Sequence, residues 1–401
     1  MQKKIIALAV AAALAAPALA MADVTVYGKA DLAVGNINNG TVSSTQMTSQ
    51  ITKLGFKGNE DLGDGLNAIW QIEQQIDINN AGSGYSTKNS FAGRNSFLGL
   101  KSESAGTVML GRHDTPYKES TRGLDVFGDQ FADNRHLMGG ASALPVTASG
   151  ALPTSTNSYN VVNSYAALMD ARPTNELMYV SPNMSGFTVK ASYVLSNDTL
   201  PTSGTTGATL QKGHLWAMDG EYKAGPLFAA LAYSNIKYGT TGAGTAYTAG
   251  AGAAGLGAGD SIKAWKAGVG YDITDAFKLN AIYEKLTSSI ANPTAGYSSN
   301  MLGRTDWYLA GVYKFNSDDV KLAYTKAGNT DGHANTGAKM IGVGYDHYMS
   351  KRTSVYVMYN KLSNDSAAAY GFNTQATTGA ASPAVTGASL SGFLVGMKHV
   401  F

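Results

Sequence analysis

Apolar and polar residues alternate along most of this sequence with a period of two. In GFTVKASYVLS, for example, Phe187, Val189, Ala191, Tyr193 and Leu195 fall on one face, and Thr188, Lys190 and Ser192 fall on the other. The stretches HLWAMDGEYK, AFKLNAIYEK and DWYLAGVYKF repeat this pattern, and the last residues, SGFLVGMKHVF, end on it at Phe401. Successive side chains of a strand point to opposite sides, so each stretch is expected to be a β-strand with one apolar and one polar face.

About sixteen such strands are predicted, and the connections between them are of two kinds. Short connections such as EDLGDG, SPNMSG and FNSDD take turns with long polar loops, and Tyr, Trp and Phe stand near the strand ends. A soluble sandwich also has half-buried strands, but it uses far fewer of them. The pattern is typical of an outer-membrane barrel. The expected fold class is therefore all-β, a transmembrane antiparallel β-barrel whose last strand pairs with the first (VTVYGKADLAVG) to close the sheet.

The first 22 residues have the features of a secretory signal peptide, with Lys3 and Lys4, an apolar run and then small residues. Cleavage is expected after Ala22, with Ala20 as the alternative, which leaves residues 23–401 as a single barrel domain. The leader holds two of the 30 basic residues and none of the 28 acidic ones, so 28 of each remain. A neutral chain is not expected to bind nucleic acid, and the absence of cysteine excludes disulfides and thiolate chemistry.

Several stretches together resemble the Gram-negative general porins, the trimeric group with sixteen strands. They are DVTVYGKADL, KLGFKGNEDLGDGLNAIWQIE, RNSFLGLKSESAGTVMLGRHDTPY, NELMYVSPNMSGFTVKASY and the terminal GMKHVF. The resemblance spans residues 23–401, with variable loops between the matching stretches. It implies a homotrimer in the outer membrane, with a water-filled channel for passive diffusion of small hydrophilic solutes and ions. It also implies that the outer-membrane insertion machinery reads Phe401 as an assembly signal.

The longest interval between predicted strands covers residues 115–171. A structureless loop of this length is uncommon unless it has a function, and the third loop of the porins folds into the barrel and narrows the lumen. The segment begins with apolar residues that could pack there and with the predicted constriction acids Asp114, Glu119, Asp125, Asp129 and Asp133. An external flap is the alternative. The position of the Ser/Thr/Ala-rich second half, inside or outside, is left open.

The resemblance places four basic residues on the pore wall: Lys53, Arg94, Arg112 and Arg172. Alternation supports an inward position for Lys53 and Arg172, whereas Arg112 shares its face with Val108 and Leu110. Fixed cations in a narrow pore favour anions, and the loop acids oppose this effect, so the channel is expected to prefer anions weakly or to select little. Lys53 stands where the family commonly has arginine, so the planar guanidinium is missing there.

Three other kinds of function remain open. A substrate-specific channel is suggested by tyrosines at inward positions, such as Tyr308 and Tyr356. An outer-membrane hydrolase would need a nucleophile and a base oriented by a third group, and no G-x-S-x-G turn or serine–histidine motif stands out. A structural or adhesive barrel would have a filled lumen and would conduct nothing.

The remaining chemical signals predict no cofactor. GAGAAG at residues 250–255 matches a dinucleotide fingerprint but lies in a Gly/Ala/Thr-rich stretch typical of an external loop. The six histidines are scattered over different segments, so no metal site is expected. The expected partners are the other copies of the trimer, outer-membrane lipid, lipopolysaccharide, and divalent cations at the acidic outer rim. The first strands and residues 66–76 are candidates for the trimer interface.

Overall fold

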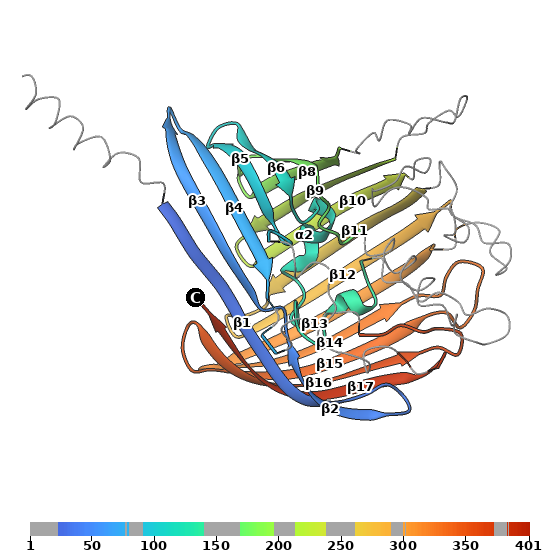
Figure 1. Ribbon diagram of the computed structural model, residues 1–401. Coiled ribbons are helices and arrows are strands. Elements are labelled where there is room, and N and C mark those ends of the chain that lie inside the picture. Colours follow the sequence, from blue (N-terminus) through green and yellow to red (C-terminus); the bar gives the residue numbers. More distant parts are fainter. Residues whose placement is uncertain are drawn as a thin grey trace, which may run out of the picture.

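The computed structural model describes residues 23–76, 78–79, 91–139, 169–195, 213–237, 261–289, 300, 302–372, 383 and 385–401. The predicted signal peptide, the second half of the long loop and the GAGAAG stretch lie outside the described residues. The described chain is mostly antiparallel sheet, rolled into a barrel (Figure 1). No helix in this part of the chain is long and apolar enough to cross a membrane.

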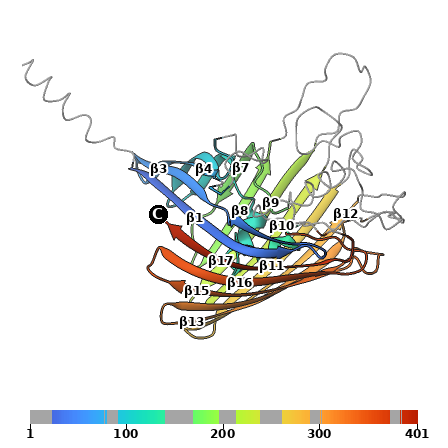
Figure 2. The ribbon, with the colours of Figure 1, turned by 60° about the horizontal axis from the view of Figure 1, so that its bottom comes forward.

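The wall of the barrel is formed by strands β1 to β17. Their bounds are β1 (Asp23–Asn38), β2 (Ser43–Ser49), β3 (Lys53–Gly63), β4 (Leu66–Gln75), β5 (Ser96–Ser102), β6 (Gly106–Arg112), β7 (Glu176–Val180), β8 (Phe187–Val194), β9 (His214–Ala224), β10 (Leu227–Lys237), β11 (Ser261–Asp272), β12 (Phe277–Ser288), β13 (Arg304–Phe315), β14 (Asp318–Ala327), β15 (Ala338–Tyr348), β16 (Thr353–Asn364) and β17 (Ser389–Val400). From β3 onward each strand pairs antiparallel with the next. Strand β1 also pairs with β17, which closes the sheet (Figures 1 and 2).

Strands β2 and β3 together count as one strand of the barrel, because they pair one after the other with the same strand, β1. Two residues of β1 between the paired segments face three residues, 50–52, on the other side, which is a β-bulge. Ile51 there has a φ of 51°, and the Gln50 N–H donates to the Asp31 carbonyl over 2.8 Å. Seventeen named strands therefore form a closed sixteen-strand barrel, and the predicted fold class is confirmed.

The predicted faces of the strands are confirmed as well. Phe187 and Leu309 lie on the outside and are about half exposed (54% and 56%), whereas their inward neighbours Tyr308 and Ala310 are buried. Aromatic rings form contacts along the outer surface, for example Tyr283 with Trp307, whose ring centroids are 4.4 Å apart. Such outward aromatic residues are what a membrane-facing barrel surface requires.

The ends of the strands explain two features of the sequence. Between β3 and β4 the chain turns in two residues, Asp64 and Gly65, with φ angles of 52° and 74°, as a two-residue hairpin of the Asp-Gly type requires. At the seam the Phe401 N–H donates to the Gly28 carbonyl over 3.1 Å, and the Gly28 N–H donates back over 2.9 Å. A Cβ at Gly28 would lie 2.5 Å from the Phe401 ring, so only glycine allows this approach.

After β6 the chain turns into the barrel as residues 114–139, which we call the inner loop (Figure 2). It contains helix α2 (Pro116–Arg122) and the 3-10 helix η2 (Asn134–His136). Helix α2 contacts β8, β9, β10 and β11 from the inside. The third long loop therefore lies in the lumen, as predicted, rather than forming an external flap.

Candidate functional site

Helix α2 begins in a way that the sequence DTPYKES favours. Thr115 is the N-cap and accepts a hydrogen bond from the Lys118 N–H, while Pro116 occupies the first turn, where no N–H is needed. The Thr115 hydroxyl also donates to the Met169 carbonyl over 3.1 Å, which joins the start of the inner loop to the chain that returns to the wall. This cap fixes the direction in which α2 enters the lumen.

The first half of the inner loop is held by polar side chains of β12 and β13. Glu284 accepts hydrogen bonds from the Tyr117 hydroxyl and from the Gly139 N–H (2.8 Å), so one carboxylate joins both ends of the loop. Asn280 donates to the Leu124 carbonyl over 2.7 Å. These bonds satisfy backbone groups that would otherwise be buried without partners. Sequence reasoning placed Asn280 and Glu284 on the polar face of their strand but gave them no role.

The second half of the inner loop, residues 131–138, is held by side chains of β13 and β16. Arg304 donates to the Leu137 carbonyl over 3.2 Å and is itself paired with Asp306 at 3.0 Å. Asn360 donates to the Phe131 carbonyl over 2.9 Å. The wall thus determines the position of the loop through bonds along its length.

Glycines in the wall make room for the apolar side of the loop. A Cβ at Gly270 would lie 2.8 Å from Leu124, and one at Gly344 would lie 2.6 Å from Phe127. A Cβ at Gly392 would lie 2.4 Å from the Phe131 ring. Because real Cβ atoms do not approach so closely, a larger residue at any of these positions would push the loop side chain away from the wall.

Three of the predicted constriction acids belong to an ion-pair cluster within the loop itself. Arg122 lies 2.5 Å from Asp129 and 3.0 Å from Asp133, and Arg135 lies 2.8 Å from Asp133. Asp125 is 3.7 Å from Arg122. The Asp133 and Asp125 side chains are fully buried, whereas those of the two arginines are about one-fifth exposed (24% for Arg122 and 19% for Arg135). The loop therefore presents its arginines to the lumen, with two of its carboxylates beneath them.

The pKa values of these acids differ because their neighbours differ. Burial by itself would raise the pKa of Asp133, but Arg122 and Arg135 hold it well below its ordinary value. At Asp125, burial and the nearby Asp133 charge raise the pKa to about 6. Burial also lowers the pKa of His136 to about 4, so this ring is neutral at neutral pH.

The other two predicted acids lie at the start of the loop. Arg172 Nη2 is 2.7 and 2.9 Å from the two carboxylate oxygens of Asp114. Lys118 is 2.7 Å from the same carboxylate. Burial opposes ionisation of Asp114, yet Lys118 and Arg172 hold its pKa well below its ordinary value. Burial lowers the pKa of Lys118 to about 8. Glu119 lies 3.4 Å from Lys190 of β8 and 3.6 Å from His113.

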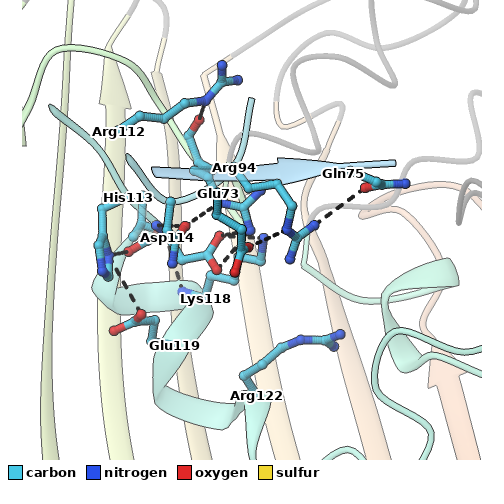
Figure 3. A network of polar contacts seen from close by, with 12 residues as sticks. Glu73, Gln75, Arg94, Arg112, His113, Asp114, Lys118, Glu119 and Arg122 are labelled. Atoms are coloured by element: carbon cyan, nitrogen blue, oxygen red, sulfur yellow. Dashed lines mark hydrogen bonds and ion pairs between the residues drawn. The ribbon is translucent and has the colours of Figure 1, made fainter. Parts of the chain in front are cut away.

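The structure brings three of the four predicted basic residues to one side of the lumen. Lys53 and Arg94 both pair with Glu73 of β4, at 3.1 and 2.5 Å, and Arg172 lies beside them, because it donates to Asn95, the neighbour of Arg94 in the chain. Arg112 does not join it. The β5–β6 register places Arg112 on the face of Val108 and Leu110, and in Figure 3 its side chain points away from the network. Its side chain donates to the backbone carbonyl of Arg172 over 3.3 Å and pairs with none of the carboxylates of this group.

The two inward tyrosines are occupied by structural bonds. The Tyr308 hydroxyl accepts from the Val126 N–H over 2.9 Å and donates to Asp125 over 3.1 Å. The Tyr356 hydroxyl donates to Asp31 over 2.6 Å. Both rings are buried, so neither of them lines a track for an aromatic or sugar ligand.

A closed barrel with an apolar outer surface and a charged loop bonded inside its lumen defines the class of the outer-membrane β-barrel channels. Comparison with known proteins gives the family. The sequence profile described as Gram-negative porin matches residues 7–368, and the chain belongs to this family. The protein is accordingly located in the outer membrane.

Relatives and solved structures agree with this assignment. The chain is 26% identical over 393 residues to the major outer membrane protein P.IB of Neisseria lactamica, covering 94% of this chain and 98% of the relative. It is 37% identical to the P.IB of Neisseria gonorrhoeae over 136 residues, about a third of each protein (32% and 36%). The fold is similar to an anion-selective porin from Comamonas acidovorans (TM-score 0.71, 22% identity, 95% of this chain and 100% of that one). It also resembles OmpF of Salmonella typhi in a complex with daunomycin (TM-score 0.60, 19% identity, 95% and 98%).

Proposed function

We propose that this protein is a diffusion pore, through which small hydrophilic solutes and ions pass down their gradients in water. The observation that carries this proposal is that charged side chains inside the barrel are partly accessible to solvent, among them Lys53 (27%), Glu119 (28%) and Asp129 (25%). A structural barrel with a filled lumen would bury such groups, because an exposed charge needs water. Membership of the porin family and the barrel support a channel rather than an enzyme.

The charges on the inner loop and on the wall beside it favour a weak preference for anions. On the wall side Lys53 is more exposed than its partner Glu73, whose side chain is 5% exposed. On the loop side Arg122 and Arg135 cover Asp133 and Asp125. An ion in the lumen therefore meets more cationic than anionic surface, with Glu119 and Asp129 as the exceptions. A small difference of this kind changes the ratio of anions to cations modestly and leaves both permeant.

The wall geometry favours a trimer in which neighbouring copies cover strands β5 to β7. Strands β5, β6 and β7 have only seven, seven and five residues, against ten to twelve in β9 to β17. At a rise of about 3.3 Å per residue and a tilt of roughly 35–45°, such strands span only about 12–19 Å, less than the apolar band of about 25 Å. The outward residues of β5 and β6 are aliphatic, such as Leu98 and Leu110, whereas outward ring pairs occur from β8 to β13.

The same proposal extends to the predicted interface and partners. Strand β4, within the candidate segment 66–76, adjoins the short strands and carries the outward Trp70 and Ile72. We assign lipid and lipopolysaccharide to the aromatic side of the barrel, and recognition by the insertion machinery to Phe401, whose ring lies on the outside of the seam. Cross-linking of purified protein in detergent would test the trimer, and a monomer as the sole species would contradict it.

The experiment that tests the pore is a planar bilayer with purified protein under a KCl gradient. Discrete conductance steps are expected, with a reversal potential displaced slightly toward that of chloride. Folded protein without any steps would point to a filled lumen and to the structural alternative. A reversal potential at that of potassium would contradict the charge argument while leaving the pore intact.

A further inference from the structure

The connection that follows β16 also enters the barrel, although it belongs to the outer end of the wall. Its first part, residues 364–372 with the sequence NDSAAAYGF, contains Ala368, Tyr370 and Phe372, which are at most 2% exposed. Surface loops usually leave such residues exposed. Here they join a buried cluster with Phe131 and Leu137 of the inner loop.

Phe372 makes direct ring contacts with the inner loop. Its ring centroid lies 4.4 Å from that of Phe131 and 5.4 Å from that of His136, the latter in an edge-on arrangement. Both distances lie in the range of favourable aromatic pairs. Tyr370 lies near the same part of the inner loop. The Arg304 guanidinium is 5.7 Å from the Tyr370 ring, and the same side chain donates to the Leu137 carbonyl.

The segment is itself fixed to the wall by Asn364, the last residue of β16. The Asn364 side chain donates to the Tyr370 carbonyl over 3.0 Å and accepts from the Tyr370 N–H over 2.8 Å. It also donates to the Ala388 carbonyl over 2.8 Å, just before β17 begins. A single side chain therefore bends the connection inward and holds it at both ends.

We propose that residues 364–372 form a strap that holds the second half of the inner loop in place, and that Phe372 is a positioning residue for the pore. The first half of the inner loop contains helix α2 and is held by contacts with strands β8 to β12. The second half, residues 131–138, receives hydrogen bonds from two wall side chains, and it packs against apolar wall residues on one side and against the strap on the other. Removing the Phe372 ring would leave Phe131 and His136 without their ring partner on one side, and this half of the loop would move more often. The proposal rests on the diffusion-pore function, since it concerns the width of that pore.

The test compares Phe372→Ala with the wild type in single-channel recordings. Loss of a buried aromatic ring is large enough for the population of closed or narrowed states to rise at least about tenfold, with a lower voltage for closure. Phe372→Leu should restore most of the wild-type behaviour. Tyr359→Ala is the matched control, because it removes an aromatic ring from β16 on the outward face. Folding is checked by the shift of each variant on a gel after heating.

Two further results decide the interpretation. Phe131→Ala should cause the same flicker, and the double variant Phe131→Ala/Phe372→Ala should add little to either single variant, because both remove one contact. Additive effects would contradict the contact. A larger conductance without flicker in Phe372→Ala would mean that the segment only fills space, and unchanged recordings would also overturn the proposal. If the wild type itself shows no steps, the diffusion-pore function fails before the strap is at issue.

Discussion

Removal of the Lys53 charge is the sharpest test of how the wall sets ion selectivity. Lys53→Gln deletes one positive charge whose side chain is 27% exposed to the lumen. Its partner Glu73 keeps Arg94 at 2.5 Å, so the variant leaves no buried carboxylate without a cation, which is the usual cause of misfolding after such changes. The substitution should therefore act on the ions and not on the fold.

The size of the effect follows from Coulomb's law with screening. For an ion that passes about 6 Å from the charge in water, the interaction is about 0.7 kcal/mol, reduced to about 0.4 kcal/mol at 0.1 M salt, where the Debye length is about 10 Å. The local concentration of each ion then changes about twofold, in opposite directions for anion and cation. The anion-to-cation permeability ratio should fall about fourfold. At 1 M salt, with a Debye length of about 3 Å, the change should be less than about 1.5-fold.

The assay is the reversal potential under a KCl gradient, measured at low and at high salt. Lys263→Gln is the matched control, because Lys263 shares the outward face of β11 with Trp265 and its loss changes the net charge equally. The control should leave the reversal potential unchanged at both salt concentrations. The reasoning is refuted if Lys53→Gln also leaves it unchanged at 0.1 M, or if its effect is as large at 1 M as at 0.1 M.

Three other predictions concern the loop and the seam. Tyr308→Phe removes the hydroxyl shared by Val126 and Asp125, at a cost of about 1–3 kcal/mol for buried polar groups left without a partner. Open-channel noise should therefore rise, while the heat-modifiable trimer persists. Channels as quiet as the wild type would argue against this anchor. Since the pKa of Asp125 is about 6, lowering the pH from 7.5 to 5 should neutralise its carboxylate and shift the reversal potential toward that of chloride. Asp125→Asn should lose the part of the shift that this carboxylate causes. A full shift in the variant would mean that another group causes it. Deletion of Phe401 removes the backbone bonds to Gly28 and the proposed assembly signal, so cell fractionation should find unassembled protein in the periplasm. Phe401→Tyr should assemble normally. A normal trimer yield after the deletion would show that Phe401 is not an assembly signal.

Much of the barrel could be predicted from the sequence because the period of two is a local property. Faces such as that of Phe187, Val189 and Tyr193 follow from alternation alone, and the Asp-Gly turn at residues 64–65 has a local signature. The bulge between β2 and β3 could not be predicted. It depends on a bond between Gln50 and Asp31, 19 positions apart in the chain, and nothing local in QIT marks an extra residue.

The site was harder to predict, for a physical reason. Sequence reasoning identified the loop acids but could not tell which cation would neutralise each of them. Asp133 pairs with Arg122 and Arg135, from the same loop, whereas Asp114 pairs with Arg172, in the chain that returns to the wall. These pairings depend on how the loop folds back on itself, and α2 and η2 set that geometry. The anchors Asn280 and Asn360 were equally hidden, since an inward asparagine in a water-filled barrel needs no special partner.

An ion in this pore encounters the charges that lie at the lumen surface, and the charges buried beneath them have less effect on it. The inner loop carries five acids and three bases in its sequence, and a count alone would make it an acidic surface. Its deepest carboxylates, those of Asp125 and Asp133, lie beneath arginines, so at the lumen their field is largely offset by Arg122 and Arg135. Lys53 also has a counter-charge, Glu73, but that buried carboxylate is shared with Arg94, so part of the lysine charge remains uncompensated at the lumen. Deleting the lysine should therefore change selectivity more than neutralising Asp125 does, although each change removes one unit of charge, and a comparison of Lys53→Gln with Asp125→Asn at 0.1 M salt measures that difference directly.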